Sequence, residues 1–324
     1  MTAAGSLLRE EILRSGPIPL RRFMEVALYH PECGYYRRNR DPFGKRGDYY
    51  TAEQLQPVFG ILIAARIRSL FEELGRPADF MVVELGAGRA EMASALAGFR
   101  YLPVEVEGGW WPEKFTGVVF SNEFFDALPV DLAAFRGSEF REVRVGWNGR
   151  RFAWVDGEAV TGELESYLSR YTISRQEGDL VEINLETLRW LEEIARRLER
   201  GYVFTIDYGY TVRESVRFRQ GTLMSYRRHT AEENVLAEPG ERDITAHVCF
   251  TALEEHGAAH GLETVRFEPL SQTLLAAGEP DQFAAALAGE TEEERLQRRL
   301  QLKTLLYGMG ETFRTLLQRK GGKK

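Results

Sequence analysis

Cysteine is scarce and long apolar runs are missing, and both absences exclude classes of protein. The 324 residues contain two cysteines, Cys33 and Cys249, far apart and outside any C-x-x-C pattern. This excludes a disulfide scaffold and indicates free thiols in a reducing compartment, the cytoplasm. No apolar run approaches the roughly 20 residues that span a bilayer. Targeting signals contain few acidic residues, but Glu10 and Glu11 occur close to the start of this sequence. We therefore expect neither a membrane span nor a targeting segment.

An excess of positive charge is also missing. The formal net charge is −7, which argues against broad binding to nucleic acid phosphates. The five histidines are scattered. His256 and His260 are four residues apart, as two metal ligands on one helix face would be, but no third ligand with a matching pattern is near in the sequence. We therefore predict no metal site.

What is present is an alternation of apolar strands and amphipathic helices, typical of an α/β protein. Helices are predicted at 6–14, 53–74, 90–96, 186–198 and 252–260, and helices from 271 to Leu317. Strands are predicted at 80–85, 101–106, 117–121, 180–184, 202–207 and 262–267. An apolar–polar alternation over 130–155, with a turn at Trp147-Asn148-Gly149, predicts a β-hairpin added to the sheet. We expect an N-terminal helical cap with a cofactor-covering loop (1–75), a core with the hairpin insertion (76–270) and C-terminal helices (271–324).

A glycine-rich turn carries the main functional signal. Glu84-Leu85-Gly86-Ala87-Gly88-Arg89-Ala90 follows a buried strand, and glycines there let the backbone turn tightly and approach a ligand closely. The dinucleotide pattern G-x-G-x-x-G requires a small sixth residue, but that position is Glu91, so a nicotinamide oxidoreductase is disfavoured. An acid before the first glycine suits a ligand with ammonium and sulfonium charge. Ordinary packing of a tight strand–helix turn is the alternative.

Polar residues follow two further strands. Asn122, Glu123 and Asp126 come after the strand at 117–121, and Asp207 ends the strand at 202–207. The carboxyl ends of parallel strands form the ligand-binding edge of an α/β sheet. We therefore predict one rim that includes all of these groups. Asn122 as the N-cap of a helix is an equal alternative.

These motifs resemble those of the MidA-like family of class I S-adenosylmethionine methyltransferases, bacterial relatives of the mitochondrial complex I assembly-factor protein arginine methyltransferase. The resemblance covers nearly the whole chain. It is carried by residues 23–31, 34–36, 42–44, 47–52, 84–88, 122–129, 206–209, 221–223, 226–229, 243–248 and 308–313.

The resemblance implies a Rossmann-like class I fold, S-adenosylmethionine as cofactor and a protein arginine as acceptor. From the glycine turn and the Asn122–Glu123 block we hypothesise two sets of site residues. The cofactor would be bound by Asp48, Thr51, Glu84, Gly86, Ala87, Gly88, Glu107 and Asn122, and catalysis would be carried by Asn122, Glu123, Asp126 and Asp207.

This sequence also departs from the family. Between Gly88 and Asn122 it is shorter than the family pattern, so a helix and a strand of the core look missing, and that stretch normally supplies the acid for the cofactor ribose. Glu105 or Glu107 would take this role, with Glu107 favoured because it ends the predicted strand. Trp110 and Trp111 would either stack on the adenine or pack the shortened segment. The shortening also leaves open a second function, a non-catalytic assembly factor that retains the fold.

Overall fold

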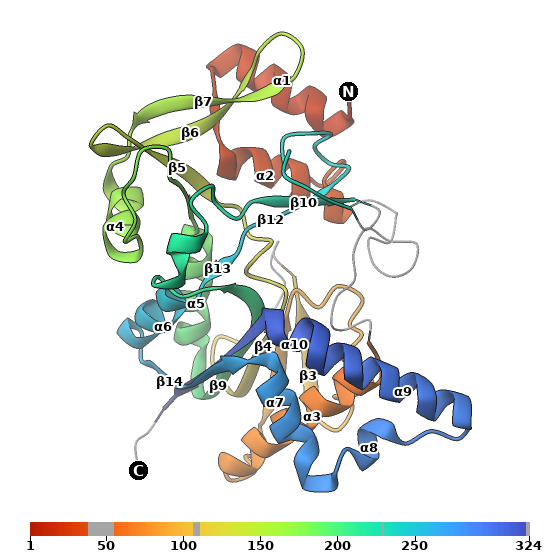
Figure 1. The fold of residues 1–324 in the computed structure, drawn as a ribbon. Coiled ribbons are helices and arrows are strands. Elements are labelled where there is room, and N and C mark those ends of the chain that lie inside the picture. The colour runs from red at the N-terminus through yellow and green to blue at the C-terminus, as the bar shows by residue number, and fades with distance from the viewer. Residues whose placement is uncertain (38–54, 106–110, 228–229, 322–324) are drawn as a thin grey trace. The chain divides into compact units, whose positions relative to one another are not determined.

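A computed structural model describes residues 1–37, 55–105, 111–227 and 230–321 (Figure 1). The chain divides into two compact units that alternate along the sequence. Unit 1 consists of Met1–Tyr50, Phe125–Arg189 and Tyr210–Thr251, and unit 2 consists of Thr51–Phe124, Trp190–Gly209 and Ala252–Lys324. No helix among the described residues is both long and apolar enough to cross a bilayer.

Unit 2 is built on a mixed sheet with strand order β14-β15-β9-β4-β2-β3. The strands β3, β2, β4 and β9 are parallel, whereas β15 is antiparallel to both of its neighbours. The strands are β2 (Met81–Leu85), β3 (Arg100–Val104), β4 (Phe115–Asn122), β9 (Leu198–Tyr210), β14 (Leu262–Pro269) and β15 (Phe313–Lys320). The helices are α3 (Val58–Glu73), α5 (Leu185–Arg197), α6 (Phe250–Ala259), α7 (Leu270–Gly278), α8 (Ala284–Leu287), α9 (Glu292–Thr304) and α10 (Gly310–Thr312), of which α5 and α6 begin in unit 1.

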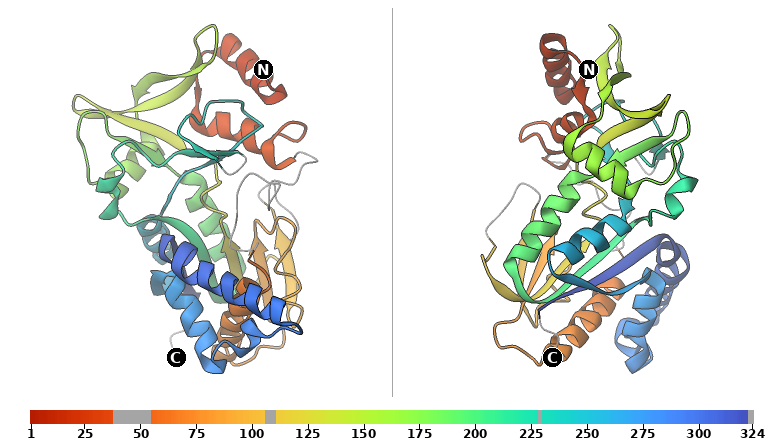
Figure 2. Two further views of the ribbon diagram at one scale, coloured as in Figure 1. Left: turned by 45° about the vertical axis from the view of Figure 1, so that its right-hand side comes forward. Right: turned by 90° about the vertical axis from the view of Figure 1, so that its left-hand side faces the viewer.

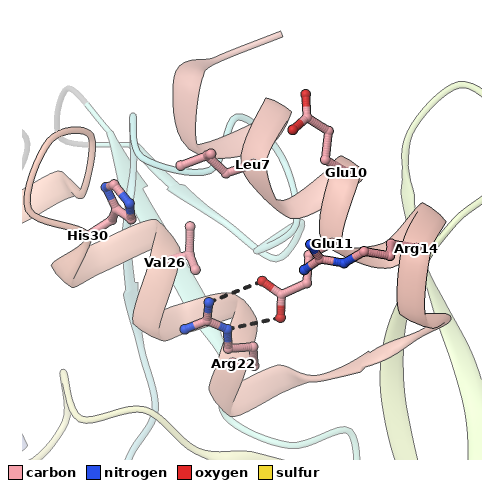
Figure 3. A pocket seen from close by; sticks show the side chains of 7 residues that line it. All are labelled: Leu7, Glu10, Glu11, Arg14, Arg22, Val26 and His30. Atoms are coloured by element: carbon pink, nitrogen blue, oxygen red, sulfur yellow. Dashed lines mark hydrogen bonds and ion pairs between the residues drawn. The ribbon is translucent and has the colours of Figure 1, made fainter.

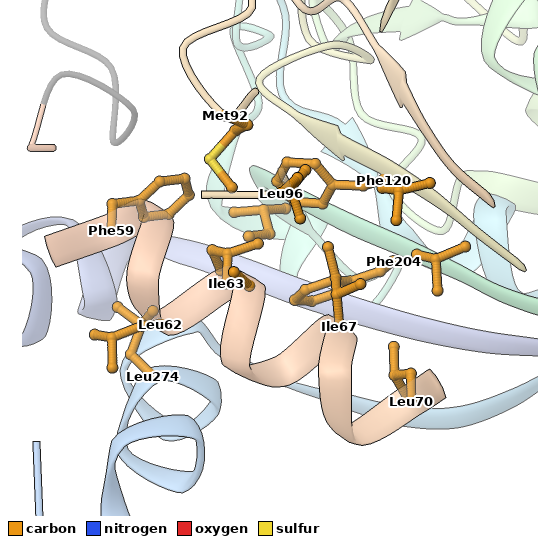
Figure 4. Close-up of a cluster of buried hydrophobic side chains, with 14 of the residues drawn as sticks. Phe59, Leu62, Ile63, Ile67, Leu70, Met92, Leu96, Phe120, Phe204 and Leu274 are labelled. Carbon is orange, nitrogen blue, oxygen red and sulfur yellow. The ribbon is translucent and has the colours of Figure 1, made fainter. Parts of the chain in front are cut away.

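Helix α3 packs an apolar stripe onto one face of this sheet. Phe59, Ile63 and Ile67 are fully buried and recur at helical spacing, and they meet Phe120 and Phe204 from the strands (Figure 4). The helix ends at Gly75, whose φ of +80° suits a left-handed helix cap. Helices α5 and α6 cover the opposite face of the sheet (Figure 2). Both faces of the central strands β2 and β4 are therefore buried, as their apolar sequences require.

Unit 1 holds two antiparallel sheets. The larger has the order β1-β6-β5-β8, with β7 paired to β6, and the smaller has the order β11-β10-β12. The elements of unit 1 are α1 (Ala3–Ser15), β1 (Ile18–Pro19), α2 (Leu20–Tyr29), β5 (Asp131–Arg136), β6 (Glu139–Trp147), β7 (Phe152–Ala159), α4 (Gly162–Tyr171), β8 (Leu180–Ile183), β10 (Met224–Arg227), β11 (Thr230–Glu232), β12 (Asp243–Thr245) and β13 (Val248–Cys249). Its core lies between α1, α2 and the larger sheet, where the rings of Phe23 and Phe152 meet edge to face at 5.4 Å.

The predicted hairpin is confirmed as β6 and β7, which turn at Asn148, whose side chain accepts hydrogen bonds from the backbone N–H groups of Arg150 and Arg151. The prediction that it joins the α/β sheet is wrong, because β6 and β7 pair within the separate sheet of unit 1. The strand predicted at 180–184 also belongs there, where β8 pairs with β5.

The prediction of helix through Leu317 is wrong as well. Residues Phe313–Lys320 form β15, which lies between β9 and β14. Leu316 and Leu317 are both buried, on opposite faces of the sheet, so the segment shows no polar–apolar alternation. A short apolar run of this kind does not distinguish a buried strand from a helix.

Candidate active site

The carboxyl ends of the parallel strands bring three predicted segments to one edge of the unit 2 sheet. Leu85, the last residue of β2, lies opposite Ser121 of β4, and Asn122 lies opposite Ile206 of β9. The backbone N–H of Glu123 donates to the carbonyl of Ile206 at 3.0 Å. The glycine turn, the Asn122–Glu123 pair and Asp207 therefore follow neighbouring strand ends, as the sequence predicts.

Two properties require glycine in this turn: a positive φ angle and close packing at the position of a Cβ atom. Gly86 and Gly88 have φ angles of +67° and +54°. A Cβ atom on Gly86 would lie 2.8 Å from Cδ2 of Phe124, a buried ring that meets Trp190 edge to face at 5.1 Å. The N–H of Gly86 donates to the carbonyl of Val104 at the end of β3. The turn is thus fixed by one neighbouring strand and packed against the segment that follows another.

The helix predicted at 90–96 is absent, and the described chain forms consecutive turns there instead. Ala90 has a φ of +54°, in the left-handed region, and so does Gly88 two residues earlier. A right-handed helix cannot continue through such residues. Met92 and Leu96 are nevertheless fully buried in the unit 2 core, and the segment keeps separate turn hydrogen bonds, such as the one from the N–H of Leu96 to the carbonyl of Met92 at 3.0 Å.

Two acids accept hydrogen bonds at the turn. Glu84 is fully buried, and the hydroxyl of Tyr101 on β3 donates to its carboxylate. Glu105, directly after β3, accepts a hydrogen bond from the N–H of Gly88 at 2.8 Å. Of the two acids considered for the ribose, Glu105 is therefore the one with a described contact to the glycine turn. The importance of Tyr101 was not evident in the sequence, because it depends on the pairing of β2 with β3.

The Asn122–Glu123 pair combines backbone strain with an unpaired polar atom. Glu123 has a φ of +53°, which is uncommon for a residue with a side chain and clusters at functional sites. Asn122 is 5% exposed, and its Nδ2 group is 3.3 Å from the Glu123 carboxylate. Within the described part of the chain, the buried Oδ1 of Asn122 has no hydrogen-bond partner. No helix follows Asn122, so its alternative role as a helix N-cap is wrong.

Asp207 and Asp126 have different surroundings. Asp207 is fully buried in β9, and one of its carboxylate oxygens accepts the N–H of Tyr208 at 2.9 Å. Asp126 is also buried, but it belongs to unit 1, where its backbone carbonyl accepts the N–H of Ala246. The strand ends of unit 2 thus bring together Asn122, Glu123 and Asp207.

Four of the predicted residues, Asp48, Thr51, Glu107 and Trp110, lie outside the described residues. Trp111 is described and is 7% exposed. The guanidinium of Arg197 lies 4.6 Å from the centre of its indole ring, and Trp190 packs beside it. These contacts support the packing interpretation of Trp111.

A groove on unit 1 is separate from these residues. It has a volume of about 230 Å³ and lies between α1 and α2 (Figure 3). Its wall includes the ion pair of Arg22 with Glu11, and the hydrogen bond between them raises the pKa of Arg22. The opposite charges of Arg22 and Glu11 neutralise each other in this wall.

The buried acids, the glycine turn and the mixed sheet define a class of protein, the S-adenosylmethionine-dependent methyltransferases with a class I fold. Residues 95–268 match the model of a protein family described as "Putative S-adenosyl-L-methionine-dependent methyltransferase". The chain belongs to this family.

Individual relatives agree with this membership. The chain is 27% identical to "Protein arginine methyltransferase NDUFAF7 homolog, mitochondrial" of Drosophila melanogaster, over 88% of this chain and 78% of that protein. It is 26% identical to "Protein arginine methyltransferase NDUFAF7, mitochondrial" of Bos taurus, over 94% of this chain and 81% of that protein. The crystal structure of a Burkholderia thailandensis protein bound to S-adenosyl-homocysteine is similar with a TM-score of 0.89 and 29% identity, covering 99% of this chain and 93% of that one.

S-adenosylmethionine is the cofactor of this family, and the residues at the strand ends fit it. Gly86 and Gly88 both have positive φ angles and carry no side chain, which allows a ligand to approach the backbone of the turn closely. The buried Oδ1 of Asn122 is an acceptor available to a ligand donor. The acids Glu84 and Glu105 at the same turn complement a cationic ligand.

Proposed function

We propose that this methyltransferase acts on a protein and transfers the methyl group to an arginine side chain. The observation that carries the proposal is the pair of acids at adjacent strand ends, the strained Glu123 and the buried Asp207. Carboxylates bind a guanidinium through charge-assisted, bidentate hydrogen bonds. The names of the distant relatives, which are protein arginine methyltransferases, support the same acceptor.

In this proposal the two sets of residues have distinct tasks. The cofactor would be held by the turn of Gly86, Ala87 and Gly88, by Glu84, and by either Glu105 or Glu107. It would be covered by Asp48 and Thr51. Bound S-adenosylmethionine supplies an electrophilic methyl group on a sulfonium. Catalysis then depends mainly on positioning the acceptor and excluding water.

The acids would hold and orient the acceptor guanidinium. Glu123 and Asp207 would bind its N–H groups, with Asp126 as a further predicted participant, and Asn122 would orient Glu123 through the 3.3 Å contact. The acceptor nitrogen loses a proton when it is methylated, and the carboxylate of Glu123 or Asp207, or a water molecule, would accept that proton. The two free cysteines support a reducing compartment, and we propose the cytoplasm as the place of action.

The test is an analysis of the methylated product. The purified chain is incubated with methyl-labelled S-adenosylmethionine and an extract from cells that lack it, and the labelled protein is hydrolysed to amino acids. We expect the label in methylarginine, strongly reduced with Glu123→Gln and retained with Glu263→Gln, an exposed acid on β14. Label in another amino acid would refute the arginine acceptor. Cofactor binding without any labelled product would favour the non-catalytic assembly factor, which the shortened core still allows.

A further inference from the structure

Two histidines and a glutamate meet on the outer surface of α5 and α6. Glu192 lies on α5, His256 lies in the last turn of α6, and His260 follows directly after that helix. The Nε2 atom of His256 is 2.9 Å from Oε1 of Glu192, and the Nε2 atom of His260 is 3.9 Å from the same oxygen. One ligand atom from each residue lies within 4.8 Å of the other two. All three residues belong to unit 2.

The backbone of α6 sets the orientation of His260. Its Nδ1 atom lies 3.0 Å from the main-chain carbonyl oxygen of His256, which can only accept, so Nδ1 carries the proton. In the neutral ring Nε2 is then an unprotonated acceptor on the side of Glu192. A metal ion placed between this nitrogen and the Glu192 oxygen, which lie 3.9 Å apart, would be bound by both. A hydrogen bond from Nδ1 to a backbone carbonyl is also how proteins orient metal-binding histidines.

The donor set selects the kind of cation. Two imidazole nitrogens and one carboxylate oxygen suit Zn²⁺ and related transition metals, whereas Mg²⁺ and Ca²⁺ prefer oxygen ligands alone. Zn²⁺ bonds of about 2.0–2.1 Å in a tetrahedral arrangement separate neighbouring donors by about 3.4 Å. The separations of 2.9 and 3.9 Å between the histidine Nε2 atoms and the Glu192 oxygen bracket that value.

The surroundings are also favourable for an ion. The carboxyl end of a helix carries partial negative charge, which attracts a cation. The Glu192 side chain is 51% exposed and that of His260 is 38% exposed, so an ion can enter from solvent. Lys320 donates to the main-chain carbonyl of His260 and thereby helps to hold the end of α6.

We propose that Glu192, His256 and His260 form a binding site for a Zn²⁺-like divalent transition metal, which links α5 to the end of α6. The three side chains fill three coordination positions, and water fills the rest. The site is structural, because the ion connects two helices that cover one face of the methyltransferase sheet.

The proposal is tested by titrating chelator-treated, full-length protein with ZnCl₂ in a calorimeter. We expect one ion per chain, and a loss of affinity of about 100-fold or more in Glu192→Gln and in His260→Gln, because each removes a direct ligand. Glu255→Gln is the matched control, since it removes the same charge from an exposed position on α6 without removing a ligand. Zn²⁺ should raise the Tm of the wild type and of Glu255→Gln, but not of the other two variants.

Two further measurements make the result decisive. S-adenosylhomocysteine binding by each variant shows whether it has folded, independently of the metal. The visible spectrum of the Co²⁺ form distinguishes nitrogen and oxygen ligands from a thiolate. Absence of stoichiometric Zn²⁺ binding in the wild type, unchanged binding in both ligand variants, or a thiolate spectrum would each overturn the proposal.

Discussion

Replacement of Gly86 by alanine tests the link between the glycine turn and cofactor binding. Two costs follow from the structure. A φ of +67° costs an alanine about 1–2 kcal/mol. The new Cβ would lie 2.8 Å from Phe124, and overpacking of a buried ring costs about 1–3 kcal/mol. The free energy of unfolding should therefore fall by about 2–5 kcal/mol.

The variant should lose cofactor affinity for the same reason. Phe124 is 2% exposed and packs against Trp190, so it has little room to move, and the turn itself must shift. A displaced turn no longer offers its backbone to the ligand, and we expect the Kd for S-adenosylhomocysteine to rise at least about tenfold. Isothermal titration measures the affinity, and denaturant unfolding measures the stability.

Gly75→Ala is the control for this experiment. Gly75 has a similar φ of +80°, but nothing lies within 4 Å of the position of its Cβ. It should therefore show the backbone cost of about 1–2 kcal/mol alone and retain full affinity. If Gly86→Ala were no less stable than Gly75→Ala and bound S-adenosylhomocysteine like the wild type, the reasoning from Phe124 would be refuted.

Four further substitutions test three individual acids. Glu123→Gln should lower methyl transfer by about 100-fold while S-adenosylhomocysteine binding is unchanged, and equal turnover would exclude Glu123 from catalysis. The buried carboxylate of Glu182 accepts hydrogen bonds from the N–H groups of Thr222 and Leu223, and burial raises its pKa. Its contribution to the free energy of unfolding is therefore present at acidic pH and is lost as the pH rises through the raised pKa. Glu182→Gln should therefore gain in Tm relative to the wild type as the pH rises, whereas Glu182→Ala should lose about 1–3 kcal/mol from unpaired amides. Hydrogen bonds from Arg196, and secondly from Arg197, lower the pKa of Glu193 from 4.5 to about 2. Glu193→Gln should therefore lower the Tm at pH 7. This difference in Tm from the wild type should vanish as the pH falls from 4.5 toward 2. For Glu182 or for Glu193, a difference in Tm between variant and wild type that does not change with pH would contradict the pKa shift assigned to that residue.

The sequence predicts best where one local pattern dominates. The buried strand β2 and the glycine turn after it are recognisable because apolar residues meet Gly86 and Gly88 directly. Helix α3 is recognisable from its apolar stripe, although it begins at Val58, later than the predicted Glu53.

The errors arise where distant residues decide the structure. The segment 90–96 has the composition of a helix, but the positive φ of Ala90 depends on the packing of the turn before it. Phe313–Lys320 becomes a strand because β9 and β14 lie on either side of it. The contact between Glu192 and His256 spans 64 residues of sequence, so no local spacing reveals it.

The position of β15 also has a consequence for biosynthesis. It lies between β9 and β14, yet it follows both of them in the chain, so β14 joins the sheet only through a strand that the ribosome makes later. While translation is in progress, the edge of β9 that will receive β15 exposes backbone groups without strand partners. A nascent chain arrested before Phe313 would lack β15 and would therefore carry this open edge.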